Sequence, residues 1–181
     1  MDKILKEIPQ EVRNRAQKIK AILFDVDGVL TDGSIIYTNS GDEIKAFNVK
    51  DGQIISHLKR LDFVVGAITG RESALVERRC QELKLDYCFQ GAKDKFQIVQ
   101  DIAAERGLKL DEVAYIGDDI IDLRVIKNVG LGAAPADALS YVKDEAHFIT
   151  KKSGGNGVLR ELGDMILAQQ GKLKQIIEDH T

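Results

Sequence analysis

Short unbroken runs of apolar residues recur along the chain. They are continuous rather than alternating with polar residues, which is typical of strands buried on both faces of a parallel sheet. The runs cover residues 21–24, 63–68, 113–116 and, more weakly, 87–89. Between them, apolar residues recur at helical spacing and predict helices over residues 53–61, 72–83, 95–106 and 120–128. This alternation predicts an α/β fold with a doubly wound, mainly parallel sheet.

Both ends of the chain also have regular patterns. In residues 1–20, apolar residues recur every three or four positions among charged ones, so we expect one N-terminal helix there. Residues 147–149 predict an edge strand, and residues 158–169 predict a last helix. The segment 154–181 is therefore expected to form a helix and a tail, with a frayed helix end after Gly171.

Residues 31–49 break the strand–helix rhythm. Two short β-prone runs, 35–37 and 43–47, flank a turn of Asn, Ser, Gly and Asp at 39–42. This pattern predicts a β-hairpin insertion, which is too short to have a core of its own. Its apolar side chains could pack on their own domain, but their density on so small an element favours an oligomer interface.

The composition changes this picture little, but it excludes several classes of protein. The chain has 181 residues, 44% hydrophobic and 30% charged, with no linker or repeat, which predicts one domain over 1–181. Acidic and basic residues are mixed, and the net charge is −3. Nucleic acids and anionic membranes need concentrated positive charge, so neither is an expected partner.

Two further features bear on the compartment. No apolar stretch approaches the ~20 residues that span a bilayer, and the first twenty residues lack the apolar run of a secretory signal. Cys80 and Cys88 are too few for a zinc site, and we interpret them as small buried residues in a reducing compartment. A disulfide between them is the less favoured alternative. The chain is therefore expected to be cytoplasmic.

Polar residues follow the predicted strands where each strand ends. In an open α/β sheet, ligands bind beyond these carboxyl ends. The residues are Asp25, Asp27 and Gly28 after the first run, Thr69, Gly70 and Arg71 after the second, Asp118 and Asp119 after the run at 113–116, and Lys95 after the run at 87–89. Crowded carboxylates repel one another unless a cation neutralises them, and a set of oxygen ligands suits Mg²⁺.

This set of residues also suits phosphate chemistry. Thr69, Lys95 and the backbone amides of the glycines are donors for a phosphate group. A carboxylate such as Asp25 can attack phosphorus and form an aspartyl-phosphate. A second carboxyl group two residues later, Asp27, can protonate the leaving oxygen and then deprotonate the attacking water.

Four motifs in this order resemble those of the haloacid dehalogenase superfamily of phosphatases. They are residues 25–31 (DVDGVLT), residues 69–71 (TGR), Lys95 and residues 117–122 (GDDIID). The resemblance covers roughly residues 20–165 and implies a Rossmann-like core. Three more segments, 24–33, 46–52 (AFNVKDG) and 154–161 (GGNGVLRE), resemble a subclass without a cap domain. The resemblance of these segments implies hydrolysis of a phosphorylated eight-carbon keto sugar acid made for lipopolysaccharide.

The resemblance implies partners as well as a substrate. It implies Mg²⁺ dependence and a homotetramer in which the 31–49 hairpins meet at the centre. The C-terminal tail is expected near the site of a neighbouring subunit. Thr69 follows Asp27 by 42 positions, which the hairpin and one helix fill, so no cap domain fits between them.

Roles follow for the matched residues. The resemblance makes Asp25 the nucleophile and a metal ligand, Asp27 the acid/base with its carbonyl on the metal, and Asp118 the third metal ligand. Asp119 and Asp122 have supporting roles. The phosphoryl group is held by Thr69 and Lys95. The substrate-binding set comprises Asp27, Gly28, Asn48, Val49, Lys50, Asp51, Gly52, Gly70, Arg71, Arg79 and Lys95.

Several alternatives remain open for single residues. Thr69 could cap a helix, and Lys93 competes with Lys95 because either lies near a helix start. Asp119 and Asp122 could be first-turn acids favoured by the helix dipole. Three glycines in 154–157 suit a loop that passes close to a ligand or to another backbone.

Alternatives also remain for the whole chain. The nearest alternative substrate is a nine-carbon keto acid phosphate. A phospho-accepting receiver module is a rival from another class, but its acceptor aspartate should end the third strand rather than the first. A relative that has lost catalysis is disfavoured by the intact acidic motifs. His57, His147 and His180 have no metal-binding spacing.

Overall fold

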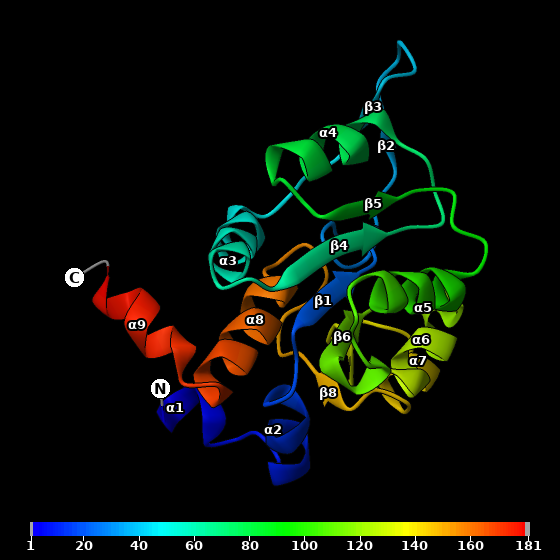
Figure 1. Ribbon diagram of the computed structural model, residues 1–181. Helices are drawn as coiled ribbons and strands as arrows, with labels where there is room; N and C mark the ends of the chain where they lie inside the picture. The colour runs from blue at the N-terminus through cyan, green and yellow to red at the C-terminus, as the bar shows by residue number, and fades with distance from the viewer. Residues whose placement is uncertain (1, 180–181) are drawn as a thin grey trace.

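A six-stranded parallel sheet forms the centre of the protein (Figure 1). The structure, a computed structural model, describes residues 2–179. The strand order is β5-β4-β1-β6-β7-β8. The strands are β1 (Ala21–Phe24), β4 (Val64–Ile68), β5 (Tyr87–Phe89), β6 (Val113–Ile116), β7 (Leu131–Ala134) and β8 (Phe148–Ile149). The prediction of a doubly wound, mainly parallel sheet is confirmed.

Strand β7 was not predicted from the sequence. Its residues, Leu-Gly-Ala-Ala, have neither the bulk nor the β-branching that mark a buried strand. The structure explains the glycine, because a Cβ on Gly132 would lie 2.2 Å from the carbonyl oxygen of Ile126. Close packing of α6 (Leu123–Asn128) on this strand therefore excludes a larger residue there.

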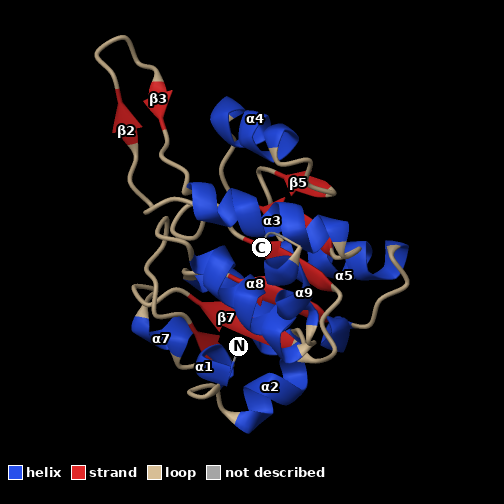
Figure 2. Ribbon diagram, turned by 90° about the vertical axis from the view of Figure 1, so that its left-hand side faces the viewer, coloured by secondary structure: helices blue, strands red, loops and turns tan. Residues whose placement is uncertain are grey.

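Helices cover both faces of the sheet (Figures 1 and 2). One face is covered by α3 (Val49–Arg60), α4 (Ala74–Glu82) and α8 (Val158–Gln169), and the other by α5 (Lys95–Glu105), α6 and α7 (Ser140–Lys143). Each layer has its own apolar core against the sheet. Cys80 of α4 is buried, Cys88 of β5 is half-buried, and both are free thiols. None of the helices described over 2–179 has the length and apolar character to cross a membrane.

The N-terminal segment differs from the single helix predicted over residues 1–20. It contains two short helices, α1 (Asp2–Leu5) and α2 (Gln10–Ala16), separated by a turn at Pro9. Proline has no amide hydrogen to continue a helix but suits the position before a new one. The single helix predicted over residues 120–128 also differs from the structure, where a 3₁₀ turn, η2 (Ile120–Asp122), precedes α6.

The C-terminal end is also more ordered than predicted. Gly171, with φ +73°, ends α8 and is followed by a separate helix, α9 (Lys172–Glu178), rather than by a frayed end. Leu173 of α9 is buried, and the Nζ of Lys172 lies 4.7 Å from the centre of the Phe63 ring. These contacts fix α9 against the start of β4; His180 lies outside the described residues.

The predicted hairpin is present and projects from the body of the protein (Figures 1 and 2). Its strands β2 (Ile36–Tyr37) and β3 (Glu43–Ile44) pair antiparallel, with Ile36 opposite Ile44. Ile36, Tyr37 and Ile44 are 48%, 62% and 47% exposed. Between β1 and β4 the chain forms only this hairpin and α3, joined by irregular segments, so no cap domain is inserted there.

Candidate active site

The carboxyl ends of β1, β4 and β6 lie side by side because these three strands are neighbours in the sheet. This arrangement brings together residues that are far apart in the sequence. They enclose an open pocket of about 290 Å³, lined by Asp25, Asp27, Gly33, Ile35, Thr69, Gly70, Arg71, Asp118, Asp119 and Ile121. The sequence predicted most of this lining, whereas Gly33, Ile35 and Ile121 were not assigned to the site.

Three carboxylates crowd at the base of the pocket. Oxygen atoms of Asp25, Asp118 and Asp122 all lie within 4.8 Å of one another. Burial, followed by repulsion from Asp122, raises the pKa of Asp25 to about 6. Burial, followed by repulsion from Asp25, raises the pKa of Asp118 to about 7. Both groups are therefore arranged so that their ionised forms need a compensating cation.

The residues present fit a hard divalent cation. The buried Oδ1 of Asp118 has no hydrogen-bond partner among the described residues, so it is available as a ligand. The ligand atoms are oxygens, which suit Mg²⁺ rather than a soft metal. A Cβ on Gly28 would lie 2.2 Å from the Oδ2 of Asp118, so only glycine leaves room for that carboxylate.

Asp122 differs from the other two carboxylates because both of its oxygens are already bonded. Its Oδ1 accepts hydrogen bonds from the ammonium of Lys95 at 2.7 Å and the hydroxyl of Tyr115 at 2.6 Å. Its Oδ2 accepts the backbone N–H groups of Asp118 and Asp119 at 3.1 and 3.2 Å. Asp122 therefore holds Lys95 and the 118–119 turn in place.

Lys95 lies directly beside the predicted nucleophile. Its Nζ is buried, 3.0 Å from the Oδ1 of Asp25. The N–H of Val26 donates to the same oxygen at 2.7 Å. Oδ2 of Asp25 has no such protein contact within residues 2–179 and can face a ligand. Lys95, rather than its competitor Lys93, makes the ion pair with the nucleophilic carboxylate of Asp25.

The loop after β4 supplies the other side of the pocket. Thr69 is buried, and its Oγ1 accepts the N–H of Arg71 at 3.4 Å. Helix α4 begins only at Ala74, with Ser73 before it, so Thr69 is not a helix cap. A hydroxyl and an arginine thus line the same pocket as Asp25, where a phosphate ester can be held.

Asp27 has a partner that the sequence did not indicate. The Nζ of Lys45 lies 2.5 Å from the Oδ1 of Asp27 and 3.5 Å from Glu43. Glu43 also accepts hydrogen bonds from Arg71 and Ser73. The foot of the hairpin is thereby tied to both sides of the pocket. In the sequence, a lysine directly after a short strand looks the same as a lysine on the surface, so Lys45 could not be recognised as a site residue.

The predicted substrate-binding residues of 48–52 do not reach this pocket in a single chain. Asn48 caps α3 by accepting the N–H of Lys50 and donates to the carbonyl of Gly155. Asp51 accepts the N–H of Arg160 at 2.8 Å, and its burial raises its pKa to about 6. Val49 and Lys50 are exposed. Asn48 and Asp51 therefore join α3 to the start of α8.

Arg79 and Gly52 lie beside each other on the same flank. The guanidinium of Arg79 lies 5.6 Å from the centre of the Phe47 ring and contacts Glu82. A Cβ on Gly52 would lie 2.8 Å from Arg79, so the glycine leaves space for it. Arg71 lines the pocket but Arg79 does not, so the two arginines are not brought to one cluster.

The glycine loop at 154–157 packs against the catalytic turn. A Cβ on Gly154 would lie 2.2 Å from the carbonyl oxygen of Gly28, and the N–H of Gly155 donates to Val29 at 2.9 Å. Of the two alternatives for these glycines, the structure shows a close approach to another backbone. The loop supports the turn that carries Asp27.

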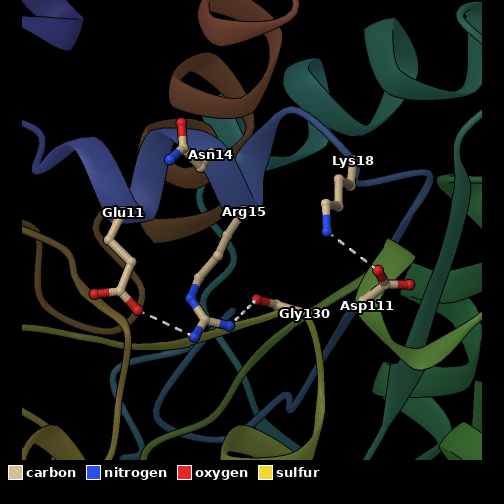
Figure 3. A pocket seen from close by; sticks show the side chains of 6 residues that line it. All are labelled: Glu11, Asn14, Arg15, Lys18, Asp111 and Gly130. Carbon is tan, nitrogen blue, oxygen red and sulfur yellow. Dashed lines mark hydrogen bonds and ion pairs between the residues drawn. The ribbon is translucent and has the colours of Figure 1, made fainter.

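A second pocket, of about 300 Å³, lies at the opposite end of the sheet (Figure 3). Its charges pair with one another: Arg15 contacts Glu11 and the carbonyl of Gly130, and Lys18 contacts Asp111. Since these groups neutralise each other and no catalytic set lies among them, the chemistry is assigned to the carboxyl ends of the strands.

Comparisons with known proteins show which family the chain resembles. A family model described as haloacid dehalogenase-like hydrolase matches residues 89–162. The chain is 40% identical over 168 residues to the 3-deoxy-D-manno-octulosonate 8-phosphate phosphatase of Escherichia coli K12, covering 93% of this chain and 89% of that protein. It is 42% identical over 167 residues to the Yersinia pestis enzyme of the same name, with 92% and 89% covered.

A solved structure shares the whole fold. The 3-deoxy-D-manno-octulosonate 8-phosphate phosphatase of Moraxella catarrhalis, in complex with a magnesium ion, a phosphate ion and a KDO molecule, superposes with a TM-score of 0.92. It is 37% identical, and the match covers 94% of this chain and 98% of that one.

Proposed function

The chain belongs to the haloacid dehalogenase-like hydrolases, and we propose that it hydrolyses 3-deoxy-D-manno-octulosonate 8-phosphate to the free sugar acid and phosphate, in lipopolysaccharide precursor synthesis. The observation that supports this most is the convergence of Asp25, Asp27, Thr69 and Asp118 on one pocket, with the Nζ of Lys95 3.0 Å from Oδ1 of Asp25. Relatives of about 40% identity over nearly the full chain carry the same activity in their names.

The proposed mechanism uses two carboxyl groups on one turn. Oδ2 of Asp25 attacks phosphorus, and the bond from phosphorus to the sugar oxygen breaks. Protonated Asp27 gives its proton to that leaving oxygen. Asp27 then takes a proton from water, which attacks the aspartyl-phosphate, releases phosphate and restores Asp25. Lys95 and Thr69 hold the phosphoryl oxygens, and Lys95 also keeps the nucleophile in place through Oδ1.

We assign Mg²⁺ to the carboxylates of Asp25 and Asp118 and the carbonyl oxygen of Asp27. A bound Mg²⁺ offsets the repulsion between the nucleophilic carboxylate and the anionic ester. The raised pKa values of Asp25 and Asp118 and the unpartnered Oδ1 of Asp118 support this assignment. The Moraxella relative is a complex with magnesium.

The assembly is proposed to be a homotetramer built on the 31–49 hairpin. Its exposed Ile36, Tyr37 and Ile44 support this, because nothing else in the described chain covers them. The pocket is open, and a neighbouring subunit would supply the missing wall. Helix α9 lies at the start of β4, away from its own pocket, which favours contact of the C-terminal segment with a neighbour's site.

The test is phosphate release from a panel of sugar-acid phosphates, with and without Mg²⁺. We expect the eight-carbon keto acid phosphate to have the highest kcat/KM, and Asp25→Asn to abolish release. A higher kcat/KM for the nine-carbon keto acid phosphate would show that this compound, and not the eight-carbon one, is the substrate. One phosphate bound per chain, without turnover, would instead favour a receiver module.

A further inference from the structure

Lys45 is a buried lysine at the foot of the hairpin, directly after β3. Its side chain is only 1% exposed. An ammonium group loses its hydration at such a position and persists there only when carboxylates replace the water. Two carboxylates do so, those of Asp27 at 2.5 Å and Glu43 at 3.5 Å. The lysine is therefore held at one place by its charge.

The contact with Asp27 is directional. Lys45 donates to Oδ1 of Asp27, and the hydroxyl of Thr31 donates to the same oxygen at 3.4 Å. Oδ2 of Asp27 has no hydrogen-bond partner among the described residues. Asp27 lines the pocket and Lys45 does not. One oxygen of the acid/base is thus fixed by the protein, while the other remains available to exchange a proton.

The lysine is itself anchored from the opposite side of the pocket. Oε1 of Glu43 lies 3.3 Å from Arg71, and its Oε2 accepts the hydroxyl of Ser73 at 2.5 Å. Arg71 and Ser73 follow β4, whereas Asp27 follows β1. The hydrogen bond of Ser73, first among several contacts, lowers the pKa of Glu43 and keeps its charge opposite Lys45.

We infer that Lys45 is a positioning residue for the reaction: it fixes Oδ1 of Asp27 so that Oδ2 points to the leaving oxygen. This rests on the proposed function, in which Asp27 is the acid/base. The consequence is specific to proton transfer. Asp25, Thr69 and Lys95 make no contact with Lys45, so its loss leaves the nucleophile and these two phosphoryl contacts in place. Arg71 is linked to Lys45 only through Oε1 of Glu43, whose other oxygen Ser73 still holds.

The experiment compares two esters that differ in their need for an acid. A sugar phosphate releases a poor leaving group that must be protonated, whereas p-nitrophenyl phosphate releases a good one. kcat/KM reports the steps up to departure of the leaving group. It is measured at saturating Mg²⁺ for the wild type, Lys45→Met, Lys45→Arg and the control Lys127→Met, which removes an exposed lysine paired with Glu145 at 3.0 Å.

For Lys45→Met we expect kcat/KM to fall about 10- to 100-fold with the sugar acid phosphate, and less than about threefold with p-nitrophenyl phosphate. Lys45→Arg keeps a cation and recovers most of the loss, and Lys127→Met behaves as the wild type. Equal losses with both esters indicate a general disturbance of the pocket and overturn the inference. An unchanged kcat/KM for the sugar acid phosphate also overturns it.

A crystal structure of the Lys45→Met protein gives a second readout. We expect the Asp27 carboxylate to rotate away from its wild-type position, and an unmoved carboxylate contradicts the inference. If the wild type hydrolyses other alkyl phosphates but not the eight-carbon one, only the proposed substrate fails. The contrast is then measured with the alkyl ester that it does hydrolyse. A wild type that hydrolyses no phosphate ester overturns both proposals.

Discussion

The buried ammonium of Lys95 lies 3.0 Å from the Oδ1 of Asp25, and Asp122 holds it from the other side at 2.7 Å. Lys95→Met leaves these two carboxylates facing each other with no cation in the metal-free protein. Removal of one partner from a buried ion pair costs about 3 kcal/mol of unfolding free energy. We expect that loss in urea denaturation without Mg²⁺, together with a fall in kcat of about 100-fold or more.

Lys127→Met is the matched control for Lys95→Met. Lys127 is exposed and pairs with Glu145 at 3.0 Å, and an exposed pair contributes only about 0–1 kcal/mol. A Lys95→Met protein as stable as this control would show that Lys95 is not needed to balance the buried carboxylates.

Gly28 leaves the space that the Asp118 carboxylate fills. Gly28→Ala places a Cβ 2.2 Å from Oδ2 of Asp118 and must displace that carboxylate. We expect the rise in Tm on adding Mg²⁺ to disappear and phosphate release to fall with it. Gly107→Ala is the control, since Gly107 also has a positive φ but no atom within 4 Å. Both variants lose about 1–2 kcal/mol from the left-handed conformation, so an intact Mg²⁺ response in Gly28→Ala would contradict the assignment.

Asp51 predicts a pH dependence of folding. Burial raises its pKa to about 6 in the folded chain, above the value of about 4 in an unfolded chain. Its ionised form therefore opposes folding above pH 6, and this penalty is relieved as the pH falls from about 6 to about 4. Asp51→Asn has no carboxyl group to titrate and therefore removes up to about 3 kcal/mol of this pH dependence. The Asn side chain still has an oxygen that can accept the N–H of Arg160, so this hydrogen bond is kept.

Urea denaturation at about pH 7.5, above the window of about 4 to 6 that the pKa values set, and at about pH 4.5, near its lower end, compares the wild type with Asp51→Asn. The exposed Asp144, changed to Asn, is the control. If the wild type and Asp51→Asn change in parallel over this range, burial of the Asp51 carboxylate is not the source of the effect.

We expect substitutions of exposed hairpin residues to disrupt assembly of the protein without disrupting its folding. Ile36 and Ile44 face each other across β2 and β3 and are both about half exposed. Changing both to Asp is expected to convert the proposed tetramer to smaller species in size-exclusion chromatography with light scattering. Ile149→Asp, an equally exposed residue on β8, should keep the wild-type state. A tetramer that survives the double change would place the interface elsewhere.

Much of the site could be predicted because its residues can be recognised from the sequence directly around them. Asp25, Thr69 and Asp118 each follow an apolar run, and the rule that ligands bind at the carboxyl ends of parallel strands brings them together. The same reasoning fails for Lys45. Its burial depends on where the hairpin folds back, and nothing near it in the sequence distinguishes it from the exposed Lys50.

Other features depend on contacts across the fold. Strand β7 contains Gly132 because α6 packs closely on it, and its Leu-Gly-Ala-Ala sequence does not resemble a strand. Asp51 looks like a polar first-turn residue of α3, yet its carboxylate binds the backbone at the start of α8. Such partners, more than a hundred positions apart, leave no local pattern in the sequence.

The position of β1 between β4 and β6 has a consequence for synthesis on the ribosome. β1 leaves the exit tunnel first, but its two neighbours pair with it only after residues 64–67 and 113–116 have emerged. Long-range pairing of this kind is slow and leaves apolar edges exposed meanwhile. A nascent chain therefore cannot complete the acidic cluster until Asp122 is outside the ribosome, and a chain truncated before that point should be a target for chaperones rather than a partial enzyme.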